Sequence, residues 1–251
     1  AIVGIGVAFF AGVRDSVPVM KNTADTYFDD YNFMDLKIMS TIGMTKEDVS
    51  AIRQVDGVAG VYGSYSMDVL NTHNNQQRVY KLLSYPMNAK AEDENYINQM
   101  RLIKGRLPQK ADECVIEYTN IKGADSRIGE TITFASGTDE KLDASLKRST
   151  YKIVGEVTMP YYLSYEKGSS AIGSGSIDNY AVIPDTNFKS SYYTEVYVTV
   201  DGAKKPNSYA DAYFDIIDPK KTTITALGEE RAQERFDSVH VAHVGEILVI
   251  P

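Results

Sequence analysis

The chain has 251 residues and a formal net charge of −8, and an acidic chain without a basic block is a poor partner for the phosphates of nucleic acid. Its single cysteine, Cys114, excludes an internal disulfide and any metal cluster built from several cysteines. With 43% hydrophobic residues, 18 tyrosines and no tryptophan, the composition indicates a folded protein rich in strands.

The first thirteen residues carry no charge, and as a helix they would span about 20 Å, less than the roughly 30 Å of a bilayer core. Three interpretations stay open: a buried strand or helix, the outer end of a truncated membrane helix, or a signal remnant. Amphipathic spacing continues from Arg14 to Phe28, which favours a membrane helix running into a stalk over residues 7–30, with Pro18 as its expected kink. An insertion after Asp30 is expected to leave the domain folded, because that position lies outside the predicted core.

The first half of the chain predicts a β-α-β unit followed by a hairpin. Residues 34–40 alternate as a strand, and Thr45 to Asp48 resembles a capping box that begins a helix ending near Gln54. Residues 58–70 are expected to form one long or two short strands. After a turn at 71–76, residues 78–85 form the returning strand of the hairpin.

A second β-α-β unit is predicted late in the chain. Residues 195–200 alternate as a strand, Asn207 caps a helix over 209–217 that ends at Asp218-Pro219, and residues 222–225 form a short strand. The two units are expected to pack as a ferredoxin-like sheet with both helices on one face, the alternative being two unrelated small units. Residues 229–236 are typical of a charged helix, and the apolar tail 246–251 of a strand or the approach to a membrane segment.

The middle of the chain is expected to be a β-rich insertion. Short strands are predicted at 113–118, 130–134, 151–157 and 179–183, separated by segments rich in turn residues. The Gly/Ser stretch 168–176 lacks the Lys-Ser/Thr ending of a phosphate-binding loop, so a mobile loop is expected there. These changes in composition predict two lobes with a hinge near 108–113 and 185–195.

Few residues suggest chemistry. His240 and His243 are spaced to bind a metal from a helix if a carboxylate joined them, but incidental surface or packing histidines are the favoured interpretation. His73 falls in a polar turn, and Cys114 falls in an apolar strand, where a buried structural thiol is expected. The remaining candidates are expected to serve solvation or packing rather than glycosidase chemistry or a sugar or peptide platform: Asp29-Asp30, Glu92-Asp93-Glu94, Tyr161-Tyr162 and Tyr192-Tyr193.

The chain also lacks a G-x-S-x-G nucleophile motif and an H-E-x-x-H metal motif. We therefore assign no catalytic, cofactor-binding or metal residue, and expect no cofactor. A binding or mechanical module is favoured over an enzyme.

Four motifs, in order, resemble the extracytoplasmic core domain of MacB/FtsX-like ABC transporter permeases. They are Leu102-Ile-Lys-Gly105-Arg106-Leu-Pro108, Asp112-Glu-Cys-Val-Ile116, Ile128-Gly129-Glu-Thr-Ile132 and Tyr151-Lys-Ile-Val-Gly155. The resemblance covers most of residues 1–226, and the expected source is a Gram-positive bacterium. It departs at the C-terminus, where such members often continue into long coiled-coil helices; here a short charged helix is expected, as in an excised ectodomain.

The resemblance implies an α+β fold in which a porter-like lobe built from two β-α-β units carries a β-rich, sabre-like lobe. The expected ranges are 1–30 for the membrane helix and stalk, 31–112 and 191–226 for the porter-like lobe, 113–190 for the sabre-like lobe, and 227–251 for the C-terminal helix and return to the membrane.

The resemblance also implies a function. The domain would lie on the extracytoplasmic side of the cell membrane and transmit conformational change for export, lipoprotein release or signalling. Expected partners are a separate ATPase subunit, a second permease copy, the membrane and an extracytoplasmic protein or peptide. Two alternatives stay open: a ligand-sensing domain for a peptide antibiotic or lipid, and a metal-dependent enzyme at His240 and His243.

Overall fold

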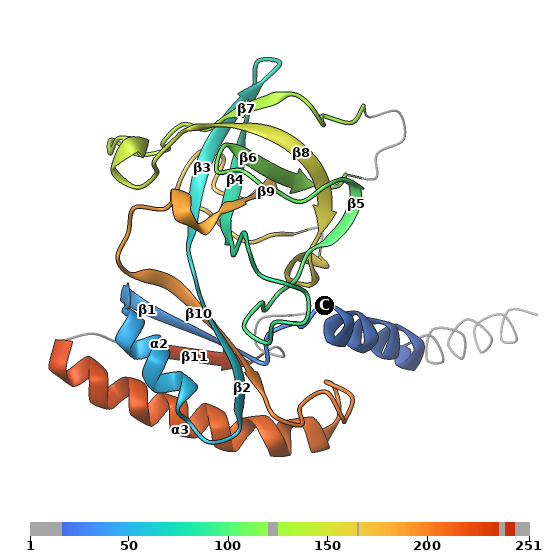
Figure 1. Ribbon diagram of the computed structural model, residues 1–251, viewed down its shortest axis with the longest axis vertical. Helices are drawn as coiled ribbons and strands as arrows, with labels where there is room; N and C mark the ends of the chain where they lie inside the picture. The colour runs from blue at the N-terminus through green and yellow to red at the C-terminus, as the bar shows by residue number, and fades with distance from the viewer. Residues whose placement is uncertain (1–16, 120–124, 165, 236–238, 244–251) are drawn as a thin grey trace, which may run out of the picture.

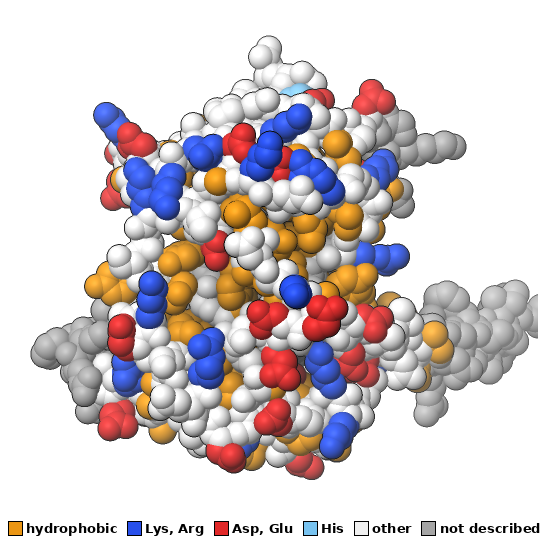
Figure 2. Space-filling view, viewed as in Figure 1, with side chains coloured by type: hydrophobic (Ala, Val, Ile, Leu, Met, Phe, Trp, Pro, Cys, Tyr) orange, Lys and Arg blue, Asp and Glu red, His pale blue; other side chains and the backbone are white. Residues whose placement is uncertain are grey.

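The computed structural model describes residues 17–119, 125–164, 166–235 and 239–243, and these form two sheets, one above the other (Figure 1). Strands β3 to β9 form the upper sheet, and β1, β2, β10 and β11 form the lower one with helices α2 and α3. The mixed α+β class is therefore confirmed. In the space-filling view, apolar side chains gather in the waist between the two parts (Figure 2).

The lower sheet has the order β11-β1-β10-β2, with every neighbouring pair antiparallel. Its elements are β1 (Leu36–Met44), α2 (Lys46–Arg53), β2 (Val58–Ser64), β10 (Tyr193–Val200), α3 (Asp211–Arg235) and β11 (Val239–His243). Two β-α-β units thus interleave as in a ferredoxin-like sheet, as predicted. Both helices pack on the same face, because residues of α2 and α3 share one core with alternate residues of β1 and β10.

The capping box at the start of α2 is confirmed. The Thr45 hydroxyl accepts a hydrogen bond from the Asp48 backbone N–H (3.1 Å), and the Asp48 carboxylate accepts one from the Thr45 backbone N–H (2.8 Å). Asp48 therefore replaces the usual Glu without loss of either contact. Its other oxygen accepts a bond from Arg231 at 2.5 Å, which ties α2 to α3.

The end of the second β-α-β unit differs from the prediction. The helix does not end at Pro219, residues 222–225 are helical rather than a strand, and the fourth strand is β11. Burial explains this difference, since Ile217 and Ile224 are 0% and 1% exposed and lie two turns apart on one face of α3. The hydroxyls of Thr222 and Thr223 donate to carbonyls four residues earlier, so the threonines are accommodated within the helix.

The upper sheet has seven strands, in the order β3-β4-β9-β6-β8-β5 with β7 paired to β8. Its strands are β3 (Ser66–His73), β4 (Gln76–Tyr85), β5 (Arg101–Gly105), β6 (Glu113–Glu117), β7 (Thr131–Thr133), β8 (Thr150–Thr158) and β9 (Asn179–Pro184). The four predicted strands of this region are confirmed. Alternate residues of β6 and β9 enter two different cores, one inside the curved sheet and one towards the waist. Short 3-10 helices occupy Leu142–Ala144, Pro160–Tyr162 and Asp185–Asn187.

The sheets divide the chain differently from the predicted ranges, since β3, β4 and β5, expected with the first lobe, belong to the upper sheet. The chain passes from the lower to the upper sheet at Tyr65, between β2 and β3, and returns between β9 and β10. Residues 108–113 connect β5 to β6 within the upper sheet. The reason is that residues 58–73 form one extended segment that contributes a strand to each sheet. The residue pattern of this segment does not change at Tyr65, where the chain passes from one sheet to the other.

A helix over residues 17–30 precedes β1 and lies beside the waist (Figure 1). The predicted beginning of this helix, the apolar residues 1–13 and the tail 246–251 lie outside the described residues. The helix is packed at its end, where Phe28 and Phe33 are 4% and 5% exposed and stack at 4.9 Å. Asp30 is itself exposed, but it lies between these two buried rings, so an insertion after it would disturb the core, contrary to the expectation. Among the described residues, no helix is long and apolar enough to cross a membrane.

Candidate functional site

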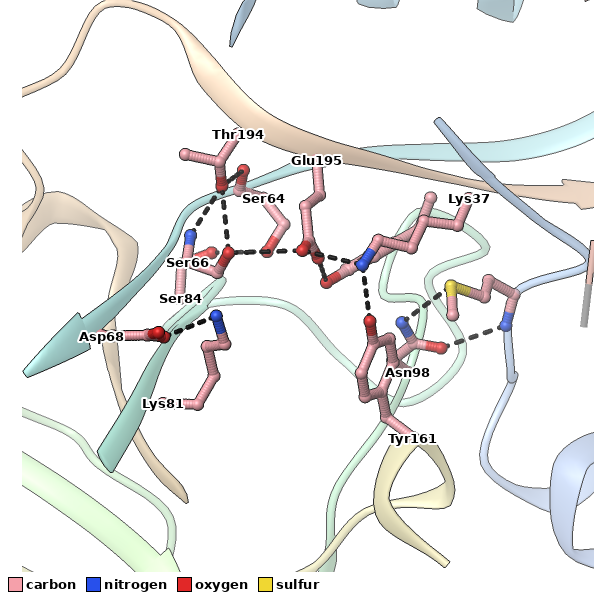
Figure 3. Close-up of polar contacts among 12 residues, drawn as sticks. Lys37, Ser64, Ser66, Asp68, Lys81, Ser84, Asn98, Tyr161, Thr194 and Glu195 are labelled. Carbon is pink, nitrogen blue, oxygen red and sulfur yellow. Dashed lines mark hydrogen bonds and ion pairs between the residues drawn. The ribbon is translucent and has the colours of Figure 1, made fainter. Parts of the chain in front are cut away.

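The waist between the sheets contains a buried ionic cluster centred on Lys37 of β1 (Figure 3). The Lys37 ammonium lies 2.8 Å from the carboxylate of Glu195 on β10, and it donates to the hydroxyl of Tyr161 at 2.5 Å. Tyr161 belongs to the 3-10 helix that follows β8, so this contact joins the lower sheet to the upper one. The side chains of Lys37 and Glu195 are 9% and 12% exposed. Because water reaches neither charge well, each charge depends on the other for its stabilisation.

The local electrostatics favour a charged lysine. Burial opposes the ammonium form of Lys37, but the Glu195 carboxylate and the Tyr161 hydroxyl together outweigh burial and raise its pKa. Tyr197, which also donates to Glu195, has its pKa raised by burial and by the same carboxylate. Burial also raises the pKa of Tyr161, so both tyrosines stay neutral beside the charged Lys37.

Hydroxyl groups extend the cluster along the crossing between β2 and β3. Ser66 donates to the same Glu195 oxygen at 3.3 Å, and its backbone N–H donates to Thr194 at 2.7 Å. On the other side of Tyr65, the hydroxyls of Ser64 and Ser84 lie 3.0 Å apart. The two residues that flank the crossing are thus each bonded to the opposite sheet.

The segment between β4 and β5 ties the end of the N-terminal helix to the same region. The Asn98 side chain accepts a hydrogen bond from the Met34 backbone N–H (3.1 Å), and Asn32 donates to the carbonyls of Glu94 and Tyr96. Asn32 and Asn98 both adopt positive φ angles, 47° and 59°, a conformation that asparagine tolerates better than most residues. These contacts hold the helix-to-strand transition in one geometry.

The N-terminal helix itself contacts both sheets. Asp25 accepts bonds from the backbone and hydroxyl of Ser208 (2.7 and 2.6 Å), in the loop before α3. The Tyr27 hydroxyl lies 3.2 Å from that of Thr158, at the end of β8 in the upper sheet. The Lys21 ammonium lies 5.2 Å from the ring centroid of Tyr209. A displacement of this helix would therefore act on both halves of the molecule.

The waist is too well packed for an organic ligand. A cavity of about 20 Å³ lies between the sheets, lined in part by Tyr62, Ser84, Tyr96 and Tyr161. That volume holds about one water molecule. The geometry therefore favours a mechanical junction over a binding pocket at this place.

The four sequence motifs meet in the upper sheet. The Arg106 guanidinium pairs with both oxygens of Glu113 (2.7 and 2.5 Å), and the backbone N–H groups of Gln109 and Lys110 donate to the same carboxylate. These four hydrogen bonds hold the pKa of Glu113 at about 2. A Cβ at Gly105 would lie 2.3 Å from the Val154 carbonyl oxygen, and Gly105 has a φ of +75°. The motifs thus build the part of the upper sheet in which β8 lies between β5 and β6, and their role there is structural.

The residues considered for chemistry lie apart from one another. Cys114 is fully buried in β6, and burial raises its thiol pKa to about 12. His73 is exposed at the end of β3, and Asp29 lies in the last turn of the N-terminal helix with its pKa raised to about 6, chiefly by burial. Residues 92–94 form an exposed loop. Within the described residues, no three His, Cys, Asp or Glu side chains gather as metal ligands.

The helical premise for His240 and His243 is wrong, because both residues lie in strand β11. Positions three apart in a strand fall on opposite faces, so the spacing that suits a helix does not suit this strand. Of the tyrosine pairs, Tyr161-Tyr162 packs in the waist, whereas Tyr192 is 50% exposed.

Sequence reasoning missed Lys37 and Glu195. Both occupy the polar positions of alternating strands, which normally face water. The one available signal was their opposite charge on two strands predicted to share a sheet.

The chain is similar to known proteins over most of its length. A model of the MacB-like periplasmic core domain matches residues 1–216. Among solved structures, the chain is similar to the extracellular domain of the ABC-type transporter YknZ from Gram-positive bacteria, with 14% identity, a TM-score of 0.47, and coverage of 82% of this chain and 98% of that one. It is also similar to the periplasmic region of MacB from Actinobacillus actinomycetemcomitans, with 12% identity, a TM-score of 0.49, and coverage of 88% and 93%. A search of curated proteins found no match.

Proposed function

The chain belongs to the family of MacB-like periplasmic core domains and is an extracytoplasmic domain of an ABC transporter permease, and we propose that it transmits conformational change without catalysing a reaction. In this proposal, the lower sheet with α2 and α3 acts as the porter-like lobe and the upper sheet as the sabre-like lobe. The ATPase subunit would act through the rest of the permease, and a second permease copy would complete the complex. The driven process would be export, lipoprotein release or signalling.

One observation carries the proposal: the helix over residues 17–30 contacts both sheets and is joined to β1 by the short packed segment 31–35. Asp25 bonds to the loop before α3, Tyr27 contacts β8, and Lys37, on the strand that follows, bonds to Tyr161. A rigid element with contacts on both lobes passes a displacement to both. A flexible linker at the same place would absorb it.

A Gly-Ser-Gly insertion after Met20 tests this in the full-length permease with its ATPase. Met20 is 66% exposed and precedes the contacts that begin at Lys21, so the domain should remain folded, unlike a variant with an insertion after Asp30. We expect transport or signalling to be lost while ATP hydrolysis continues. The matched control is the same insertion between Asp139 and Glu140, two exposed loop residues, which should retain activity. Full activity of the Met20 variant would rule out transmission through this helix.

A further inference from the structure

The upper sheet closes on itself into a small barrel. Strand β3, at one end of the strand order, is bonded to the segment just beyond β7. The Leu70 N–H donates to the Ala135 carbonyl (2.9 Å), and the Ala135 N–H donates to the Leu70 carbonyl (2.8 Å). Because β7 pairs with β8, the strands β3, β4, β9, β6, β8 and β7 form a ring. The mouth of a barrel is a frequent place for a ligand site.

A cavity of about 290 Å³ lies at one mouth of this barrel. It is lined by residues of the β3–β4 hairpin, β5, β6, β8, β9 and the loop before β7. Tyr80 and Ile116 line it and also belong to the core inside the barrel, where they are 5% and 6% exposed, so they form its floor. In another protein a cavity of about 150 Å³ holds one benzene ring. The cavity at the mouth therefore has room for a six-membered ring with its substituents.

The charged residues of the lining balance one another. Three are cations and three are carboxylates: Arg78, Lys104, Arg127, Glu117, Asp125 and Glu156. Several of these charges already have partners, since Arg127 lies 2.9 Å from Glu130 and Glu117 lies 3.1 Å from Lys167. A ligand with a net charge would leave water without meeting an excess of the opposite charge, and that exchange is unfavourable. The lining therefore favours a polar ligand that carries no charge.

Hydrogen-bond donors and acceptors are mixed in the same lining. The Arg78 guanidinium can only donate, the Asp125 carboxylate can only accept, and the Gln76 amide can do both. A ligand ammonium would use only the acceptors, and a ligand carboxylate only the donors. A hydroxyl group both donates and accepts, so several hydroxyls on one ring can use the whole set.

We propose that this mouth of the barrel binds one pyranose ring of an uncharged sugar, either a free monosaccharide or the end of a glycan. The ring hydroxyls accept from Arg78, donate to Asp125 and exchange hydrogen bonds with Gln76. These three residues are exposed, so a sugar can reach them from solvent. The floor at Tyr80 and Ile116 supplies apolar contact for the C–H groups of the ring. The site is independent of the mechanical role proposed above.

Titration of the 251-residue chain with glucose, galactose, mannose and N-acetylglucosamine, followed by saturation-transfer NMR, tests the proposal. We expect at least one of these sugars to bind at millimolar concentration. The amino sugar and the uronic acid of the same stereochemistry should bind at least about tenfold more weakly, because each brings a charge that the lining does not compensate. The methyl glycoside of the bound sugar identifies the source: undiminished binding assigns the end of a glycan, and weaker binding assigns a free monosaccharide.

Two variants locate the site. Arg78→Met removes a charged donor and should weaken the bound sugar about tenfold, and Gln76→Ala removes a neutral partner and should weaken it about threefold. The matched control is Gln77→Ala. Gln77 is the next residue on β4, is also exposed and lies outside the lining, because successive side chains of a strand point to opposite faces. The control should bind as the unaltered chain does, and circular dichroism checks that all three variants fold.

Three results would overturn the proposal. The first is absence of binding by all four sugars at millimolar concentration. The second is a charged analogue that binds as tightly as its neutral sugar. The third is equal affinity of the Gln76→Ala and Gln77→Ala variants. None of these results would affect the insertion test of the N-terminal helix.

Discussion

Lys37 and Glu195 form a buried ion pair at 2.8 Å, although they are not direct partners in the sheet. Tyr197 is the residue opposite Lys37 on β10, and Glu195 lies two positions before it, on the same face. Such diagonal neighbours on one face are within reach of long side chains. The pair lies on the face opposite α2 and α3, and the Tyr161 hydroxyl completes it from the upper sheet.

Loss of one partner should therefore be costly. Lys37→Met leaves the Glu195 carboxylate buried without its cation, and we expect a loss of about 3–5 kcal/mol in the free energy of unfolding. The double variant Lys37→Met/Glu195→Gln should recover at least half of this, because the amide is neutral and its one oxygen still accepts a hydrogen bond from either Tyr197 or Ser66. Urea denaturation followed by circular dichroism measures both. Equal stability of the single and double variants would mean that the charge of Glu195 does not matter.

Asp35 should make stability fall as the pH rises from 4 to 6. Burial raises its pKa from 3.8 to about 6, against the opposing bonds from the Val200 backbone N–H and the Tyr213 hydroxyl. A raised carboxyl pKa means that the folded state binds the proton more tightly than the unfolded state, so stability is lost on deprotonation. The shift corresponds to about 3 kcal/mol between pH 4 and pH 7.

Asp35→Asn tests this. The amide oxygen can accept from Val200 and the amide nitrogen can donate to Tyr213, so the variant keeps both contacts without a charge. We expect its free energy of unfolding to vary less over this pH range and to exceed that of the unaltered chain at pH 8. Asp29, whose pKa is also raised to about 6, contributes the same sign in both proteins. Parallel pH profiles of the two proteins would contradict the prediction.

The ferredoxin-like half could be predicted because its signals are local. Alternation in residues 34–40 and the capping box from Thr45 to Asp48 each depend on a few neighbouring residues. Burial of Lys37 could not be predicted in this way. It depends on a second sheet covering the polar face of β1, and that contact joins residues 124 positions apart.

The passage of the chain from the lower to the upper sheet at Tyr65 also could not be predicted from local sequence. Its residues suit an extended strand on both sides, and the change of sheet is decided by contacts such as that of Ser66 with Thr194, 128 positions away. The candidate site is built almost wholly from contacts of this long-range kind. A sequence pattern therefore identifies the strands that carry the candidate site, but not the residues that form it.

Arg106→Met should destabilise the part of the upper sheet in which β8 lies between β5 and β6. Glu113 is 4% exposed and would keep only its two backbone hydrogen bonds, so we expect the free energy of unfolding to fall at pH 7. The lowered pKa of Glu113 means that its stabilising effect is present above pH 4.5 and is lost as the pH falls towards 2. The gap between the variant and the unaltered chain should shrink over that window. A gap that stays constant down to pH 2 would show that packing of the arginine, rather than its charge, matters.

Pro219 is the residue that misled the prediction of α3, and it should weaken the helix that contains it. It lies inside Asp211–Arg235, where it cannot donate the backbone hydrogen bond to residue 215 and its ring crowds that carbonyl. The helix persists because Ile217 and Ile224 are buried on either side, so packing outweighs the local preference. Pro219→Ala restores the hydrogen bond, although it also frees the unfolded chain and so returns less than the full penalty.

We therefore expect Pro219→Ala to raise the free energy of unfolding by about 1–2 kcal/mol. The matched control is Pro206→Ala in the loop before α3, where proline interrupts no helix and its removal should leave stability unchanged or slightly lower. Thermal denaturation followed at the helical circular dichroism band compares the two. If both variants shift the midpoint alike, the helix is not strained at Pro219.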